Sequence, residues 1–217
     1  MSPRRRHLLL AAALLAPALL APTIARAAGD HGFQIEARWM GTQPIGHYRA
    51  QGVKASDAEN FGGNAGMRAL IQLNRRYAIG ADIAYLKNQK DFTVDVDPRP
   101  FVTDIRTIRR SLAALPIDVL FEARTDTHRR VSGYAQGGVG ITSYTLRLTG
   151  GLQPLDRRQQ AFSWVAGGGA VVGINRDLEV VGGVDWRRSA TVNGDIWLLR
   201  DDPQYLVWSL GMRYPRW

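Results

Sequence analysis

The sequence predicts an all-β protein: an eight-stranded antiparallel up-and-down transmembrane β-barrel, preceded by a cleavable signal peptide. Two observations predict it. Residues 28–217 contain eight segments in which apolar and polar residues alternate, the pattern of strands with two unlike faces. Short polar connections alternate along the chain with long ones. The chain has no cysteine, so neither a disulfide framework nor a thiolate metal site is available.

The first 27 residues have the features of an export signal. A basic stretch, residues 4–7, precedes an apolar run, residues 8–20, and a small-x-small cleavage site ends at Ala27. A membrane-spanning helix needs about 20 apolar residues. This run is shorter and contains Pro17. We therefore expect a signal peptide at 1–27 and one domain at 28–217, with export by either the Sec or the Tat route.

Each strand of the domain is predicted from its alternation. In chain order the segments are residues 33–39, 65–73, 77–85, 113–122, 131–142, 162–174, 179–186 and 206–214. The last is typical, because Trp208 and Leu210 alternate with Ser209 and Gly211. Pro116 removes a hydrogen-bond donor from the fourth segment, so we expect a bulge there.

The connections between these strands are of two kinds. The short ones are residues 74–76, 124–129 and 175–177, and the long ones are residues 41–61, 87–105, 148–159 and 187–204. An outer-membrane barrel has tight periplasmic turns and long external loops, in this alternation. Turn-prone pairs in two long loops, Asp97-Pro98 and Asn193-Gly194, predict protruding hairpins.

The two faces of the sheet have different expected roles. Hydrocarbon offers no hydrogen-bond partner, so the sheet must close, with its apolar face outward. Aromatic rings favour the membrane interface, and the predicted girdle is Phe33, Trp39, Tyr77, Tyr85, Trp186, Trp208 and Tyr214. Buried charges persist only when paired, and the predicted lumen network is Glu36, Arg38, Arg68, Asp82, Asp118, Glu122, Glu179, Asp185 and Arg213. A soluble lipocalin-like calyx has the same periodicity with the faces reversed and remains an alternative.

This architecture and the ending Gly211-Met212-Arg213-Tyr214-Pro215-Arg216-Trp217 resemble the small outer-membrane β-barrel superfamily, which contains the OmpA transmembrane domain, OmpX, OmpW and opacity-type proteins. The resemblance covers residues 28–217. It implies a monomer in contact with the outer-membrane lipid of a Gram-negative cell. It also implies an assembly signal, carried by Gly211, Tyr214 and Trp217 and read by the barrel assembly machinery. Pro215 puts Trp217 out of phase with the alternation that the family signals keep.

The sequence favours an interaction role over catalysis. His31, His47 and His128 lie at a strand end, in a loop and in a turn, and none adjoins a serine on a lipid-facing strand as acyl transfer would require. We therefore expect no catalytic residue, cofactor, metal or nucleic-acid partner.

The expected function is a structural or surface-interaction role, through the external loops, with a surface or envelope protein as a partner. The candidate contact residues are Phe92, Phe101, Ile196 and Trp197. Three alternatives remain: a narrow conduit for small polar or apolar solutes, a lipid A-modifying enzyme, and a lipocalin-like periplasmic carrier. Eight strands leave an interior just wide enough for side chains, so we expect a filled lumen.

Overall fold

The computed structural model describes residues 32–45, 47–48, 53–54, 62–95, 105–125, 130–150, 155–190 and 203–216. The expected signal peptide, residues 1–27, lies outside them. The barrel strands are β1 (Phe33–Ile45), β4 (Gly62–Gln72), β5 (Tyr77–Asp95), β6 (Ile105–Arg124), β7 (Val131–Thr149), β8 (Leu155–Gly173), β9 (Glu179–Ser189) and β10 (Gln204–Arg216). A small separate pair is formed by β2 (His47–Tyr48) and β3 (Val53–Lys54).

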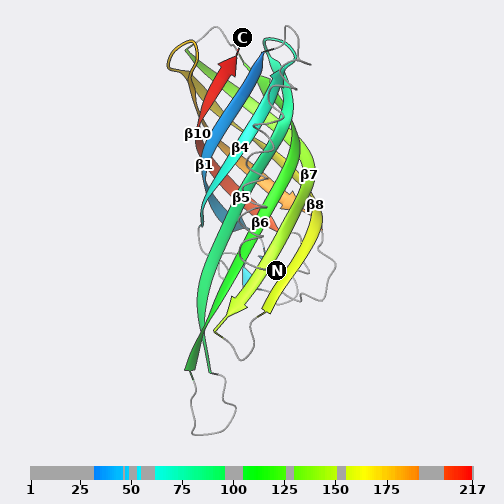
Figure 1. Ribbon diagram of the computed structural model, residues 1–217, viewed down its shortest axis with the longest axis vertical. Helices are drawn as coiled ribbons and strands as arrows, with labels where there is room; N and C mark the ends of the chain where they lie inside the picture. Colours follow the sequence, from blue (N-terminus) through cyan, green and yellow to red (C-terminus); the bar gives the residue numbers. More distant parts are fainter. Residues whose placement is uncertain are drawn as a thin grey trace, which may run out of the picture.

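The sheet closes because β1 pairs with both β4 and β10, and each remaining strand is antiparallel to its neighbours in sequence order. The predicted fold class, an eight-stranded antiparallel barrel, is therefore confirmed. Figure 1 shows the C-terminus at the end of the barrel that carries the tight turns, while β5 and β6 project from the other end. Among the described residues, no helix has the length and hydropathy needed to cross a bilayer.

Two of the tight turns share one local device. In the turn before β5, the Asn74 side-chain oxygen accepts hydrogen bonds from the backbone N–H of Arg76, at 2.8 Å, and of Tyr77, at 3.0 Å. In the turn before β9, Asn175 accepts from the N–H of Asp177 at 2.8 Å. Asparagine suits such positions because its side chain can replace a backbone acceptor. These turns set the register of the strands that they join.

The strands are longer than the alternation predicts. Residues 41–45, 87–95, 148–149, 155–159 and 187–189, expected in external loops, belong to strands. The predicted loop boundaries are therefore wrong at the external end. The backbone alternation continues there, but the polarity of its two faces reverses.

Pro116 causes no bulge, contrary to expectation. On one side Leu115, Pro116 and Ile117 pair in unbroken register with β7. On the other side the β5–β6 ladder omits Ala84 and Tyr85 and then resumes in the same register. The missing N–H of proline therefore interrupts the ladder between β5 and β6. Neither strand contains the extra residue that defines a bulge.

The barrel is inverted relative to a water-soluble domain over most of its height. Ile79 and Leu210 point outward and are 40% and 63% exposed, whereas Asp82 and Arg213 point inward and are 1% and 0% exposed. Apolar side chains thus surround the barrel and charged ones fill it. This arrangement contradicts the lipocalin-like alternative, which requires the opposite orientation.

At the external end the orientation of the faces reverses. A hydrophobic core fills the interior there, formed by Met40, Ala84, Leu86, Leu112, Ala114, Tyr144, Leu146, Ala161, Tyr205 and Val207. The outer face of the same segments is polar and exposed, with Lys87, Gln89, Asp91, Arg109, Arg147 and Arg158. An apolar interior under a polar surface is the arrangement of a barrel in water. The strands therefore continue beyond the membrane, and we call β5–β8 beyond the apolar band the external extension.

Candidate functional site

The membrane-spanning part of the lumen holds a cluster of alternating charges. Its acidic members are Glu36, Asp82, Asp118, Glu122, Glu179 and Asp185, and its basic members are Arg38, Arg68, Arg124, Arg187 and Arg213. The nine residues of the predicted lumen network all lie on this inner face. We call the whole set the ion cluster.

Arg213 on β10 bridges two carboxylates. Its Nε donates to Glu36 at 2.8 Å, and its two terminal nitrogens donate to the two oxygens of Glu122 at 2.9 and 2.8 Å. A planar guanidinium matches a carboxylate in this two-bond geometry. The contacts join β1, β6 and β10 across the lumen.

The ion cluster continues toward the external end through β5 and β9. Arg38 and Arg187 both donate to Asp82, and Arg187 also donates to Asp118. Ser163 donates a further hydrogen bond to Asp118 at 3.3 Å. Each of these hydrogen bonds joins strands that are not neighbours in the sheet. The cluster therefore fills the lumen with side chains that are hydrogen-bonded to one another.

Arg68 lies at the centre, fully buried and surrounded by carboxylates. Its nitrogens are 3.5 Å from Glu122, 3.8 Å from Asp82 and 3.9 Å from Glu36. A buried cation is tolerated only with such compensation, because desolvation costs several kcal/mol per ion. Without the surrounding carboxylates, the buried charge of Arg68 would therefore strongly destabilise the folded barrel.

Sequence analysis missed two members of the ion cluster. Arg124 donates to Glu122 and to Gln34, each at 2.8 Å, and Arg187 binds Asp82 and Asp118. Both were expected in connections. Each lies two residues beyond a predicted lumen acid, Glu122 or Asp185, and therefore on the same face of its strand.

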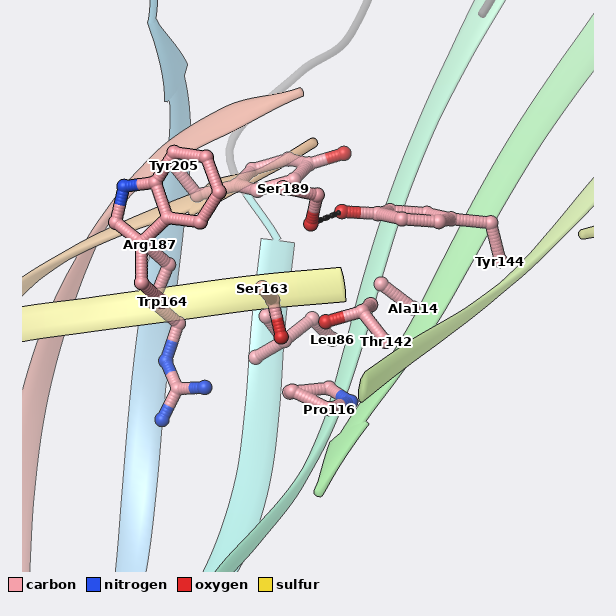
Figure 2. Close-up of a pocket in the computed structure, with 10 residues that line it drawn as sticks. All are labelled: Leu86, Ala114, Pro116, Thr142, Tyr144, Ser163, Trp164, Arg187, Ser189 and Tyr205. Carbon is pink, nitrogen blue, oxygen red and sulfur yellow. Dashed lines mark hydrogen bonds between the residues drawn. The ribbon is translucent and has the colours of Figure 1, made fainter. Parts of the chain in front are cut away.

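A small cavity marks the boundary between the ion cluster and the external core. Its volume is about 10 Å³, room for roughly one water molecule. Figure 2 shows Pro116, Thr142 and Ser163 around it, and the hydrogen bond between the Tyr144 hydroxyl and Ser189, which spans 2.5 Å. The lining of the cavity includes Arg187 of the ion cluster and Tyr144 of the external core, so the two sets of side chains that fill the lumen meet there.

Most residues of the predicted aromatic girdle lie on the outer surface. Those exposed are Trp39, Tyr77, Tyr85, Trp208 and Tyr214, while Trp186 is half-buried on the outer face. Phe33 differs from the expectation, since it is only 9% exposed although it shares the outward phase of Ile35. Sequence analysis omitted Phe121, which is exposed and stacks on Tyr77 with ring centroids 5.5 Å apart.

The external extension carries cross-strand ion pairs on its outer face. Arg109 on β6 donates two hydrogen bonds to Asp91 on β5, at 2.9 and 3.0 Å. Arg147 on β7 donates to Asp156 on β8 at 3.2 Å. The Arg109 hydrogen bonds hold the pKa of the Asp91 carboxyl below its ordinary value. These pairs give a polar, water-exposed surface.

Several candidate residues fall outside what the structure describes. Phe92 belongs to β5 by its backbone, but its side chain, like Phe101, Ile196 and Trp197, lies outside the described part. The same holds for His31, for His128, for the side chain of His47 and for Trp217. Of the other assembly-signal residues, Gly211 pairs with Arg38 across β1 and β10, and Tyr214 is exposed. In the described ranges, no group of potential ligands is arranged to hold a metal.

Comparison with known proteins identifies the fold. No protein-family profile and no curated protein sequence matches the chain. Neisserial surface protein A is 14% identical, with a TM-score of 0.56 over 85% of this chain and 96% of its own. Ail, the attachment invasion locus protein of Yersinia pestis, is 14% identical with a TM-score of 0.52 in complex with the heparin analogue sucrose octasulfate, over 85% of this chain and 98% of its own. The structure of Ail itself is 16% identical over the same shares, with a TM-score of 0.51. The chain therefore has the fold of the small eight-stranded outer-membrane β-barrels.

Proposed function

We propose that this protein is a surface-interaction protein of a Gram-negative outer membrane, in which the barrel is an anchor and the external extension, together with residues Ile196 and Trp197, presents the contact surface. One observation carries the proposal: β5 and β6 continue beyond the apolar band as a sheet with a polar outer face and an apolar interior. A barrel built only to span a membrane needs no such extension. The partner is a protein or matrix surface that reaches the outside of the cell.

The side chains that fill the lumen argue against the conduit alternative. The ion cluster and the external core fill successive parts of the interior, and the cavity between them has a volume of about 10 Å³. A planar-bilayer recording of the purified barrel should show no defined conductance steps. Steady conductance steps would favour the conduit.

We also propose that the barrel is not an enzyme. Ser163, a lumen serine near a carboxylate, donates to Asp118 and is buried beneath the external core. Its 4% exposure argues against access of a lipid substrate to its hydroxyl. An acyl-transfer assay on outer-membrane lipid should give equal product with the wild type and with Ser163→Ala.

The contact surface is tested by adhesion. The full chain is displayed on a non-adherent Gram-negative host, and binding to cell monolayers and immobilised matrix is compared with that of the double variant Ile196→Ser and Trp197→Ser. We expect several-fold weaker adhesion at equal barrel yield, where yield is the fraction with heat-modifiable migration in SDS gels. A matched control, Arg176→Ser in a periplasmic turn, should adhere like the wild type. Equal adhesion of all three proteins would remove the two residues from the contact surface.

A further inference from the structure

The described strands contain pairs of adjacent arginines on β6, β8 and β9. In Arg109-Arg110 and Arg187-Arg188 one side chain is buried, that of Arg110 or of Arg187, because adjacent residues of a strand point to opposite faces. In the third pair, Arg157-Arg158 on β8, both side chains are exposed. This pair therefore presents two adjacent cations to the outside of the cell.

Arg157 is exposed although it shares the inward phase of the buried Ser163. The reason is the length of the neighbouring strand, because β9 ends at Ser189, which pairs with Ser163. From Ser163 outward, the described ladders join β8 to β7 alone. Residues 156–160 therefore form an edge strand in the described part of the external extension, and we call them the β8 edge.

The backbone of the β8 edge directs the carbonyl of Arg158 away from β7. On the side of β9, the Phe162 carbonyl accepts a hydrogen bond from the Ala190 N–H at 2.7 Å. Backbone groups alternate in direction along a strand, so the N–H and C=O groups of Arg158 and Asp156 point to the same side as those of Phe162. A protein that holds an extended segment by main-chain hydrogen bonds can therefore pair with the β8 edge.

The β8 edge can separate from β7 at low cost. None of the side chains at residues 156–160 is buried, and the next residue, Ala161, is the first with a buried side chain toward the membrane. Segments with few buried apolar contacts and solvent-exposed backbone hydrogen bonds open locally without unfolding of the whole domain. Opening the edge breaks the backbone hydrogen bonds to β7 and the exposed ion pair of Asp156 with Arg147.

We propose that the peptide bond after Arg158 is a cleavage site for an endopeptidase that recognises two adjacent basic residues. Carboxylates in the substrate pockets of such an enzyme bind the two guanidiniums through charge-assisted hydrogen bonds. Water adds to the carbonyl carbon of Arg158, and the C–N bond to Gln159 breaks. The products are a carboxylate on Arg158 and a new amino terminus on Gln159.

Cleavage at this bond leaves the barrel closed. The ladders of β8 with β7 in the membrane-spanning part, and with β9 throughout, involve residues 161–173 of β8. All of these residues lie on the carboxyl side of the cut. The two fragments therefore stay together as one folded barrel, and only the connection between β7 and β8 is opened.

The test treats intact cells that display the full chain with a purified serine endopeptidase specific for dibasic sites. Intact cells shield the periplasmic turns. We expect a first cut that gives Gln159 as the new amino terminus, with fragments that separate only after boiling. The double substitution Arg157→Gln and Arg158→Gln should slow the cut about tenfold or more, because the charge-assisted hydrogen bonds to the enzyme are lost. The matched control, Arg109→Gln and Arg188→Gln, disrupts the other two pairs and should be cut like the wild type.

A second variant tests the opening of the β8 edge. Arg147 and Asp156 are cross-strand partners and the chain has no cysteine, so Arg147→Cys with Asp156→Cys can form a single disulfide between β7 and β8. The oxidised protein should be cut much more slowly than the reduced protein.

The proposal is overturned if the first cut falls elsewhere or if the glutamine variant is cut at the wild-type rate. It is also overturned if the oxidised and reduced cysteine variants are cut equally, or if the folded wild type resists an enzyme that cuts the heat-unfolded protein. Heat-modifiable migration of each variant verifies folding.

Discussion

Arg213→Met tests whether the ion cluster holds the barrel together. Methionine keeps most of the side-chain volume and removes the charge, so both Glu36 and Glu122 lose their hydrogen bonds from Arg213. Breaking a buried ion pair by deleting one partner costs about 3–5 kcal/mol, because an uncompensated charge remains.

The remaining contacts place the expected cost near the lower limit. Glu122 keeps Arg124 at 2.8 Å, and Glu36 keeps Arg38 at 3.4 Å. We therefore expect the free energy of unfolding to fall by about 3 kcal/mol. Adding Glu122→Gln to Arg213→Met should recover part of that loss, since one unpaired carboxylate is removed.

The assay is urea-induced unfolding in phospholipid vesicles, followed by tryptophan fluorescence and by heat-modifiable migration. The control is Arg109→Met, which removes an exposed ion pair with Asp91 and should change the unfolding midpoint far less than Arg213→Met does. If Arg213→Met has the midpoint of the wild type, the lumen charges are solvated enough to lose a partner without cost, and the reasoning fails.

Three further predictions concern other parts of the barrel. Leu210→Arg puts a charge on the exposed lipid face and should destabilise the barrel by about 2–4 kcal/mol in the same urea assay. Gly183→Ala should lower the unfolding midpoint, because the added Cβ would lie 2.2 Å from the Tyr134 hydroxyl, and Tyr134→Phe should restore part of the loss; no recovery would show that another contact is responsible. An NMR titration should find the pKa of Asp91 below its ordinary value and raised by Arg109→Met. The stabilisation from this pair is present above the unfolded-state pKa and is lost as pH falls through the folded-state pKa, so an unshifted Asp91 would contradict the hydrogen-bonded pair.

The membrane-spanning part was predictable because its pattern is simple. One phase of the alternation is apolar from Tyr77 to Tyr85, and this phase alone identifies the lipid face once closure is assumed. The external part was not recognised as strand because its pattern changes phase. In β5 the apolar positions pass from Tyr85, which faces outward, to Leu86, which faces inward. A prediction that follows one apolar phase of the alternation therefore ends the strand at Tyr85.

The two missed arginines have the same origin. Arg124 and Arg187 continue the inward phase of Glu122 and Asp185, but each was assigned to a connection because its neighbours are polar. Extending the alternation by one step would have found both. Phe33 could not be resolved in this way, because its phase is outward and its burial depends on packing that periodicity does not contain.

The reversal of polarity means that two unlike sets of side chains fill the lumen. In the membrane the plug is electrostatic and depends on paired charges. Outside, it is an apolar core around Tyr144 and Leu146, which does not depend on charge. Removing either plug alone should therefore leave the barrel closed, so Arg213→Ala and Tyr144→Ala should each be non-conducting in planar bilayers.

Combining the two substitutions should give measurable conductance, because each opens the part of the lumen that the other leaves blocked. Both deletions create cavities, so each protein must first show the heat-modifiable migration of a folded barrel. If Arg213→Ala conducts by itself, the external core does not seal the lumen, and the expectation of two independent barriers is wrong.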